Sequence, residues 1–221
     1  MDQPVEGRRA PRVIDVATWS RREAFELFRS LSFPYMGVTA DLDVTRLRET
    51  HRARGFSFTV GLVHALCTAA NDVPAFRQRI RGNDVVEHEV VDPSITVLGE
   101  GDAFRFATLR YDPDIGRFAA DADARIQRAR RSSSLWSEPD RDDLFFMTTL
   151  PWVSFTALVH PVPLDPPDSV PRIAWGRFRE QGRRVLLPLN VQAHHALVDG
   201  IDVGRFFTGA EKIVAGAGSF A

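Results

Sequence analysis

The chain has 221 residues, 44% of them hydrophobic, which is enough to bury a substantial core as one domain or, at most, two small ones. Its 28 basic and 29 acidic residues give a formal net charge of -1, which excludes a general attraction to nucleic acid or to an anionic membrane and favours a small, neutral partner. Cys67 is the only cysteine, no run approaches the ~20 apolar residues of a membrane span, and the N-terminus lacks a signal-peptide core, so no internal disulfide and a cytoplasmic location are expected.

The first half of the chain is predicted to mix short helices and strands. Residues 1–12 combine proline, glycine and charge without periodicity, which predicts a flexible N-terminal arm before a single domain over 13–221. Apolar residues recur at helical spacing over 21–31. The patterns that follow predict a strand within 35–44, helices over 45–55 and 58–72, strands over 84–91, 94–99 and 103–111, and a helix over 115–131.

The second half is predicted to be mainly β. Strands are expected over 144–150, 153–160, 172–180 and 183–195, separated by turns that contain proline or glycine. The sequence EQGRR joins the last two as a hairpin, and the Pro-rich stretch 161–171 is expected to be a surface loop. Helices early and strands later predict an α/β fold of the α+β type, with a large mixed sheet flanked by helices.

The stretch NVQAHHALVDGIDVGRFF, residues 190–207, carries the candidate chemistry. In a strand that leads into it, successive side chains point to opposite faces. The two faces then hold Leu187, Leu189, Val191, Ala193 and His195 on one side and Pro188, Asn190, Gln192 and His194 on the other. The two histidines therefore point into different sites. A partly desolvated imidazole at the end of the apolar row, that of His195, stays neutral near pH 7 and can act as a base.

The acid that follows the histidines has two interpretations. A helix is predicted to begin just after Asp199 and Gly200, because apolar residues recur at helical spacing from Val203 onward. Asp199 then lies at the helix N-terminus, where a carboxylate can cap free N–H groups, so the spacing leaves a capping role and a catalytic role open. A metal site is not favoured, because the adjacent histidines diverge and no other His or Cys has ligand-like spacing.

Several segments of the chain resemble one known family, in the same order. The signature HHxxxDG is present as HHALVDG at 194–200. The other matching segments are TWSRREAFELFR, DLDVTRL, VDPSITV, LFFMTTLPWVSFTAL and the hairpin-helix stretch that begins GRFREQGRR. Together they span nearly all of residues 13–207, and on them the chain resembles the chloramphenicol acetyltransferase family, which shares the signature with condensation domains of peptide synthetases.

The resemblance implies the two-layer sandwich fold of that family and a direct acetyl transfer. Acetyl-CoA would be the cosubstrate, with no bound cofactor or metal and no covalent acyl-enzyme. His195 would take the proton from an acceptor hydroxyl, and Asp199 would pair with Arg21 to hold the geometry of the site. Thr148 stands where family members have a serine that stabilises the oxyanion, and Thr149 is the alternative if the register is shifted by one.

The resemblance also assigns binding positions. The coenzyme A channel would be lined by Pro151, Trp152 and Phe178, with Phe178 in place of a family tyrosine. Ala174 stands in place of a family threonine that organises water beside the oxyanion. The acceptor pocket would be lined by Phe28, Met36, Thr96, Phe106, Trp136, Leu158, His160 and Val162. Such an apolar lining suits an aromatic or lipophilic alcohol, and chloramphenicol or a related small hydroxylated compound is the expected acceptor. Met36 and His160 stand where a chloramphenicol enzyme is expected to carry other side chains.

The resemblance further implies a homotrimer with active sites between subunits, where His195 comes from one subunit and much of the acceptor pocket from its neighbour. Two other functions stay open: an acyltransferase or ring-closing enzyme of secondary metabolism with another donor or acceptor, and a binding module without catalysis. Affinity for CoA would separate the first of these from the acetyltransferase. The basic run RIQRARRSSS at 125–134 is expected to be a solvated helix face, with a coenzyme phosphate contact as the alternative.

Overall fold

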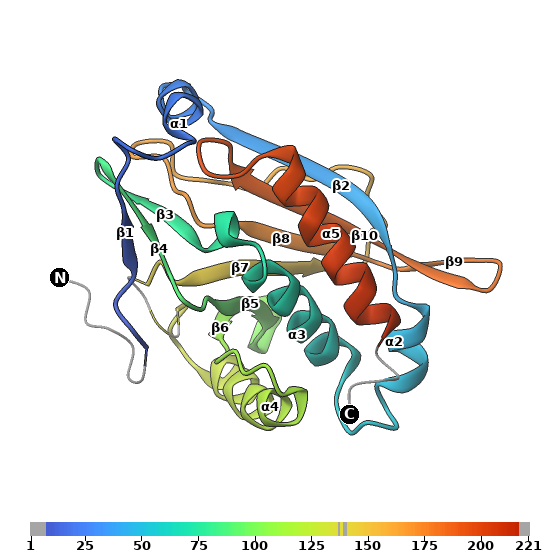
Figure 1. The fold of residues 1–221 in the computed structure, drawn as a ribbon. Helices are drawn as coiled ribbons and strands as arrows, with labels where there is room; N and C mark the ends of the chain where they lie inside the picture. The colour runs from blue at the N-terminus through green and yellow to red at the C-terminus, as the bar shows by residue number, and fades with distance from the viewer. Residues whose placement is uncertain (1–7, 137, 139–140, 217–221) are drawn as a thin grey trace.

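The computed structural model describes residues 8–136, 138 and 141–216 (Figure 1). Its helices are α1 (Arg22–Arg29), α2 (Thr45–Thr50), α3 (Phe58–Asn71), α4 (Ile115–Arg131) and α5 (Gly200–Ala215), with short 3₁₀ helices η1 (Pro74–Arg77) and η2 (Glu100–Asp102). Its strands are β1 (Arg12–Ile14), β2 (Tyr35–Asp43), β3 (Gln78–Arg81), β4 (Asp84–Glu87), β5 (Asp92–Leu98), β6 (Phe104–Thr108), β7 (Leu144–Leu150), β8 (Arg172–Gly176), β9 (Arg179–Gln181) and β10 (Arg184–His194). Within the described ranges, no helix is long and apolar enough to cross a membrane.

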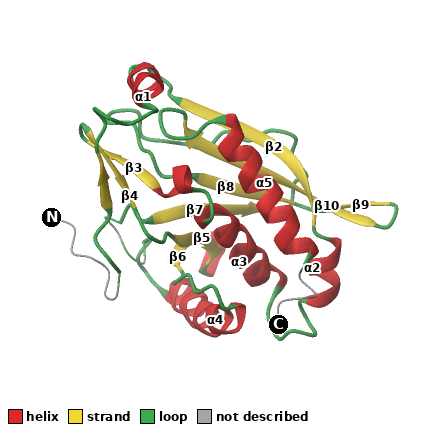
Figure 2. Ribbon diagram, viewed as in Figure 1, coloured by secondary structure: helices red, strands yellow, loops and turns green. Residues whose placement is uncertain are grey.

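Most of the strands join in one mixed sheet (Figures 1 and 2). This seven-stranded sheet has the order β2-β10-β8-β7-β5-β6, and β9 pairs with β10 through a turn in which Gly182 has a φ of +60°, a conformation that glycine adopts without strain. β7 runs parallel to β5 and β8, whereas β10 runs antiparallel to β2 and β8. Helices α3, α4 and α5 cover one face. The predicted two-layer α/β architecture is therefore confirmed.

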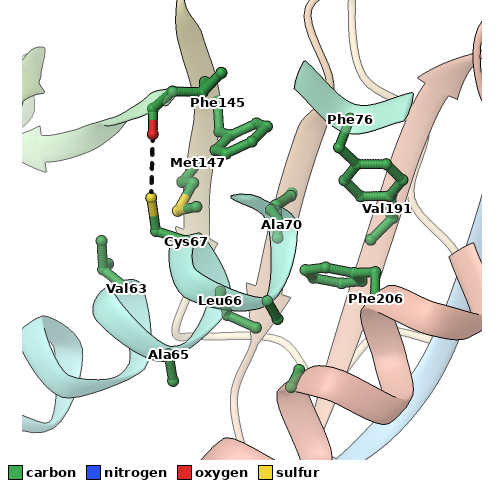
Figure 3. Close-up of a cluster of buried hydrophobic side chains, with 14 of the residues drawn as sticks. Val63, Ala65, Leu66, Cys67, Ala70, Phe76, Phe145, Met147, Val191 and Phe206 are labelled. Carbon is green, nitrogen blue, oxygen red and sulfur yellow. Dashed lines mark hydrogen bonds between the residues drawn. The ribbon is translucent and has the colours of Figure 1, made fainter. Parts of the chain in front are cut away.

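Helix α3 forms the centre of the core between the sheet and α5. Its apolar residues surround the whole helix, which is the pattern of a helix buried on all sides. Figure 3 shows Leu66 and Cys67 of α3 in one cluster with Met147 of β7 and Phe206 of α5, and all four side chains are at most 1% exposed. This packing holds β7 in place against the helical layer.

Three parts of the chain differ from the sequence-based expectation. Strands β1, β4 and β3 form a small separate sheet, of which only β4 was predicted, because strands of three or four residues give too short a periodic signal. The strand predicted over 153–160 is wrong. That segment joins no ladder with other described strands, and its backbone is held by the side chains of Asn190 and Gln192. The strand predicted over 172–180 is divided into β8 and β9.

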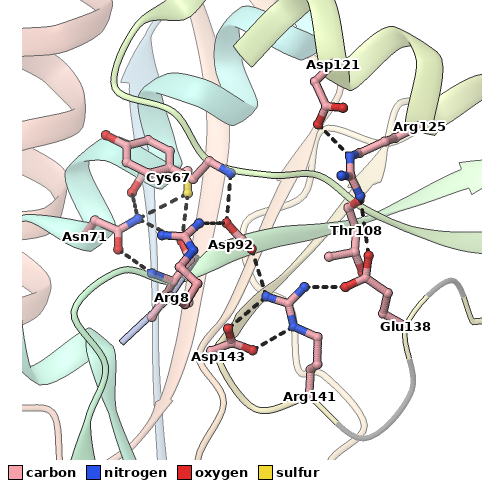
Figure 4. Close-up of polar contacts among 12 residues, drawn as sticks. Arg8, Cys67, Asn71, Asp92, Thr108, Asp121, Arg125, Glu138, Arg141 and Asp143 are labelled. Carbon is pink, nitrogen blue, oxygen red and sulfur yellow. Dashed lines mark hydrogen bonds and ion pairs between the residues drawn. The ribbon is translucent and has the colours of Figure 1, made fainter. Parts of the chain in front are cut away.

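A buried polar network anchors the start of β5 (Figure 4). Residues 1–7 of the predicted arm lie outside the described residues, but Arg8 forms an ion pair with Asp92, which is 2% exposed. Asp92 also accepts a hydrogen bond from Arg141 at 2.8 Å, and Arg141 in turn contacts Asp143 and Glu138. Because a carboxylate buried in this way is stable only when it is paired, the network fixes the starts of β5 and β7 relative to each other.

Candidate active site

His195 lies in the turn directly after β10, which ends at His194. Its backbone N–H donates to the carbonyl oxygen of Pro34 at 2.7 Å, and its ring stacks on the ring of Phe28 with a centroid distance of 3.8 Å. The ring nitrogen Nδ1 lies 2.9 Å from the carbonyl oxygen of Val198. A carbonyl oxygen can only accept, so Nδ1 carries the proton and Nε2 carries a lone pair. The turn therefore fixes an imidazole in the tautomer that a general base needs.

Arg21, at the start of α1, ties this turn together. Its Nε donates to the carbonyl oxygen of Ala196 at 2.9 Å, and its Nη2 donates to the carbonyl oxygen of His195 at 2.6 Å. Both carboxylate oxygens of Asp199 accept from the same guanidinium, one of them at 2.8 Å from Nη2. A planar fork of five donors suits this combination of two carbonyls and one carboxylate.

Asp199 is the N-cap residue of α5, and its carboxylate faces Arg21. Hydrogen bonds from Arg21 lower the pKa of Asp199 below its usual value, although partial burial acts in the opposite direction. Its Oδ1 lies 3.5 Å from Nδ1 of His195, which is farther than the Val198 carbonyl oxygen. Asp199 is thus an anion at neutral pH that balances the guanidinium charge and lies near the imidazole of His195.

His194 points to the other face of the sheet, as strand parity predicts. It is 2% exposed, its Nδ1 accepts a hydrogen bond from the N–H of Ala196 at 3.2 Å, and the ring of Tyr35 meets it edge-on. Burial lowers the pKa of His194 to about 4, with smaller effects from neighbouring charges. This histidine is therefore neutral at physiological pH and acts as a structural hydrogen-bond acceptor.

A large cavity of about 1030 Å³ opens elsewhere on the chain, at the end of β7. Thr148 lines it, and the hydroxyl oxygens of Thr148 and Thr96 lie 2.7 Å apart. The register pairs Thr148 with Ala174 of β8, so the position beside Thr148 on that strand offers a methyl group and no hydroxyl. If Thr96 donates to Thr148, the hydroxyl hydrogen of Thr148 is free to point to a ligand in the cavity.

The predicted binding residues are divided among several places. The large cavity is lined by eight of them: Thr96, Phe106, Trp136, Thr148, Thr149, Pro151, Trp152 and His160. Met36 and Leu158 line a second cavity of about 380 Å³, and Phe28 lies against His195. Val162 lines neither cavity, and Phe178 packs instead under the guanidinium of Arg48, whose Cζ is 4.0 Å from the ring centroid.

Arg130 of the basic run also lines the large cavity, whereas Arg125 of the same run pairs with Asp121 and Glu138. His195 lines neither of these two cavities. One chain therefore brings together His195 with Arg21 and Asp199, and separately the two threonine hydroxyls with an aromatic wall. Among the residues that the structure describes, no three His, Cys, Asp or Glu side chains are grouped so that they could hold a metal ion.

Two residues near the cavities were not singled out from the sequence. Asn190 and Gln192, on the polar face of β10, are 1% and 3% exposed and hold the backbone of residues 158–160. A signal was present, because two amides alternate with apolar residues in an otherwise buried strand. Buried amides need partners, and a segment that crosses this face can supply them.

Comparisons of the sequence with known proteins give one consistent result. A family model described as chloramphenicol acetyltransferase matches residues 11–210. Chloramphenicol acetyltransferase 2 of Escherichia coli is 31% identical over 195 residues, which cover 87% of this chain and 92% of the relative. Chloramphenicol acetyltransferase 3 of Escherichia coli is 27% identical and covers 90% of this chain and 94% of the relative.

Comparisons of the fold agree with those of the sequence. A solved chloramphenicol acetyltransferase superposes with a TM-score of 0.87 at 22% identity, covering 93% of this chain and all of the other. A dihydrolipoamide acetyltransferase of Azotobacter vinelandii superposes with a TM-score of 0.66 at 16% identity, covering 87% of this chain and 86% of the other. At these identities the likeness concerns the fold.

Proposed function

The chain belongs to the chloramphenicol acetyltransferase family, and from this premise we propose that it transfers an acetyl group from acetyl-CoA to a hydroxyl of chloramphenicol or of a related small alcohol. The observation that carries this proposal is the imidazole of His195, whose Nδ1 is held by the Val198 carbonyl oxygen so that Nε2 keeps its lone pair. A neutral imidazole with one fixed tautomer is suited to deprotonate an alcohol at neutral pH.

The reaction proceeds in two steps without a covalent acyl-enzyme. Nε2 of His195 takes the proton of the acceptor hydroxyl while the oxygen attacks the thioester carbonyl carbon of acetyl-CoA, which forms a tetrahedral oxyanion. The oxyanion then collapses, the carbon–sulfur bond breaks, and the leaving CoA thiolate takes the proton from the imidazolium. The products are the acetate ester and free CoA. General-base catalysis of this kind contributes about 10² to 10⁴ in rate.

Thr148 is the proposed hydrogen-bond donor to the oxyanion. Its contact with Thr96 supports this role, because a hydroxyl that receives a hydrogen bond from Thr96 directs its own hydrogen elsewhere. In the orientation that the proposal requires, Thr96 is the donor and so orients Thr148 at a place where Ala174 offers no hydroxyl. A donor of this type stabilises the transition state by about 2.7 to 4 kcal/mol.

The proposed active site lies between two subunits of a homotrimer. The separation of His195 from the cavity of Thr148 within one chain supports this arrangement, since the mechanism needs both groups within reach of one carbonyl. The His195 turn of one subunit would face the large cavity of its neighbour. Pro151 and Trp152 of that cavity would contact the coenzyme.

The proposed activity is tested by incubating the purified protein with acetyl-CoA and chloramphenicol and measuring the release of the CoA thiol. We expect turnover, and we expect the His195→Ala variant to lower kcat by about 10² to 10⁴. Ile201→Ala is the matched control, because this side chain is 63% exposed near the same turn. No turnover above the His195→Ala variant across a panel of small alcohols would contradict the proposal.

A different acyl donor is the second candidate. Phe178 packs against the guanidinium of Arg48 and is not among the residues that line the cavity of Trp152, and this separation is the observation that favours a donor other than acetyl-CoA. Calorimetric titration with CoA separates the candidates. Binding at micromolar CoA favours acetyl-CoA as donor, whereas no binding together with acetyl transfer from a carrier-protein thioester favours the second.

A further inference from the structure

His160 is held in the large cavity by two amide side chains of β10. Its backbone N–H donates to Oε1 of Gln192 at 3.0 Å, and its carbonyl oxygen accepts from Nε2 of the same amide at 3.4 Å. Its ring nitrogen Nε2 lies 3.2 Å from Oδ1 of Asn190. Both the backbone and the ring of His160 are thus fixed by groups that are themselves buried.

The Asn190 contact decides which ring nitrogen of His160 carries the proton. The Nδ2 of Asn190 lies 3.3 Å from the carbonyl oxygen of Leu158 and 2.9 Å from Oγ1 of Thr39. A carbonyl oxygen can only accept, so Nδ2 is the donor end of the amide and Oδ1 is the acceptor end. Oδ1 therefore accepts from Nε2–H of His160, and Nδ1 of His160 carries the lone pair.

The lone pair on Nδ1 is available to a ligand. Within the described chain no hydrogen bond is found at Nδ1, and it is not one of the fully buried atoms that lack a partner, so it is not sealed off from solvent. Because His160 lines the large cavity, a ligand there lies beside this ring. Burial lowers the pKa of His160, which keeps the ring neutral at neutral pH. The same cavity is lined by Thr148 and by the stacked rings of Phe106 and Trp136.

We propose that Nδ1 of His160 accepts a hydrogen bond from the acceptor substrate, so that the preferred acceptors carry a second donor, a hydroxyl or an amide N–H, besides the hydroxyl that is acetylated. This inference rests on the proposed acetyltransferase function and specifies its substrate class. An acceptor without the second donor displaces water from the cavity and leaves Nδ1 of the imidazole without a hydrogen bond. Sites that hydrogen-bond a substrate hydroxyl therefore discriminate against analogues that lack this hydroxyl.

The experiment compares two acceptors that differ only in this group, 1-phenylpropane-1,3-diol and 3-phenylpropan-1-ol, with acetyl-CoA as donor. We expect the unmodified protein to favour the diol about tenfold in kcat/KM, the effect of one hydrogen bond. The His160→Leu variant removes the acceptor nitrogen, so the ratio should fall to about one. The His160→Asn variant can place an amide oxygen on Cγ, where Nδ1 was, and should restore the preference.

Leu164→Ala is the control for a general disturbance of the loop, because Leu164 is 49% exposed and lines neither cavity. It should keep the ratio of the unmodified protein, and thermal unfolding establishes that each variant is folded. A preference that persists in His160→Leu, or none in the unmodified protein, overturns the inference and leaves the proposed function intact. Absence of turnover with every alcohol, chloramphenicol included, overturns both.

Discussion

At the scale of single residues, two adjacent histidines acquire opposite roles from their surroundings. His194 is the last residue of β10 and is buried on the polar face, where it accepts a backbone hydrogen bond. His195 is the first residue of the turn, and its side chain is 30% exposed. The change from strand to turn, rather than the residue type, buries one imidazole and leaves the other partly exposed, as the proposed base must be.

The guanidinium of Arg21 is predicted to position the base through contacts that a lysine cannot reproduce. In Arg21→Lys one ammonium replaces a fork that contacts Asp199 and the carbonyl oxygens of His195 and Ala196. We expect kcat/KM to fall about 10- to 100-fold, because the His195 turn loses its orientation. The free energy of unfolding should fall by only about 1 to 2 kcal/mol, since Asp199 is partly exposed.

Steady-state kinetics and denaturant unfolding measure these two effects. Arg22→Lys is the matched control, since the neighbouring arginine forms an exposed ion pair with Glu26. Equal losses of kcat/KM in both variants would show that Arg21 has no special role in positioning the base.

The buried His194 predicts a dependence of stability on pH. Its pKa is about 4 in the folded chain, against 6.5 for a histidine in water, so between these values the unfolded chain binds a proton that the folded chain does not. Stability is therefore complete above pH 6.5 and is lost as the pH falls towards 4, by about 3 kcal/mol over the full interval.

Unfolding in urea at a series of pH values tests this slope. His194→Asn can retain an acceptor for the N–H of Ala196 and does not titrate, so it should remove that part of the slope while other groups contribute equally to both proteins. Identical slopes in the two proteins would refute the assignment of the slope to His194.

At the scale of elements, β8 and the segment after β7 approach each other closely beside the proposed coenzyme contacts. A Cβ on Gly176 would lie 2.5 Å from the carbonyl oxygen of Val153 and 2.9 Å from Cγ of Pro188. That carbonyl accepts from the N–H of Arg177 at 2.8 Å, so the segment cannot move without losing a hydrogen bond. Only glycine allows the chain after Trp152 to lie this close to β8.

Gly176→Ala is therefore expected to destabilise the protein by about 1 to 3 kcal/mol, the usual range for overpacking. It should also raise KM for acetyl-CoA, because the strain displaces Trp152. Gly204→Ala is the matched control, since nothing lies within 4 Å of a Cβ at this position of α5. That helical substitution should stabilise by up to about 1 kcal/mol. Thermal unfolding and kinetics compare the variants, and an unchanged stability of Gly176→Ala would contradict the packing argument.

The segment 153–160 shows why one element could not be predicted. Its apolar residues have the composition that is typical of a strand, and strands are predicted from such composition. In the structure the described partners of its backbone include the amides of Asn190 and Gln192, which are far away in the sequence. Composition does not reveal that a segment is bound by side chains rather than by a neighbouring strand.

At the scale of the whole molecule, the proposed site is complete only when two chains meet. His195→Ala and Thr148→Ala variants should each be nearly inactive, because each removes one half of every site. In a mixed trimer, one interface of three combines an intact His195 with an intact Thr148. Random mixing of equal amounts therefore predicts roughly a quarter of the sites to be active, from the three-fold symmetry of the assembly.

The two variants are co-expressed or refolded together, and the acetylation rate is compared with that of each variant refolded alone. In the control, the unmodified protein is refolded together with His195→Ala, which gives the activity expected when active subunits are diluted by inactive ones. If mixing the two variants restores no activity although size measurements show mixed trimers, His195 and Thr148 act within one chain.

Taken alone, the local patterns of the sequence predicted a large mixed sheet flanked by helices and the face to which His194 points. The family and its two-layer sandwich came from the resemblance of several segments, HHALVDG among them, in the same order over residues 13–207. Only the tertiary structure gave the tautomers of His195 and His160, the contacts of Arg21 with two backbone carbonyl oxygens, and the hydroxyl pair of Thr96 and Thr148. Apart from the contact of His195 with Val198, three residues away, these features join residues that are distant in the chain, and hydrogen-bond geometry between them depends on how the layers pack. The same physical reason explains why 153–160 was assigned wrongly.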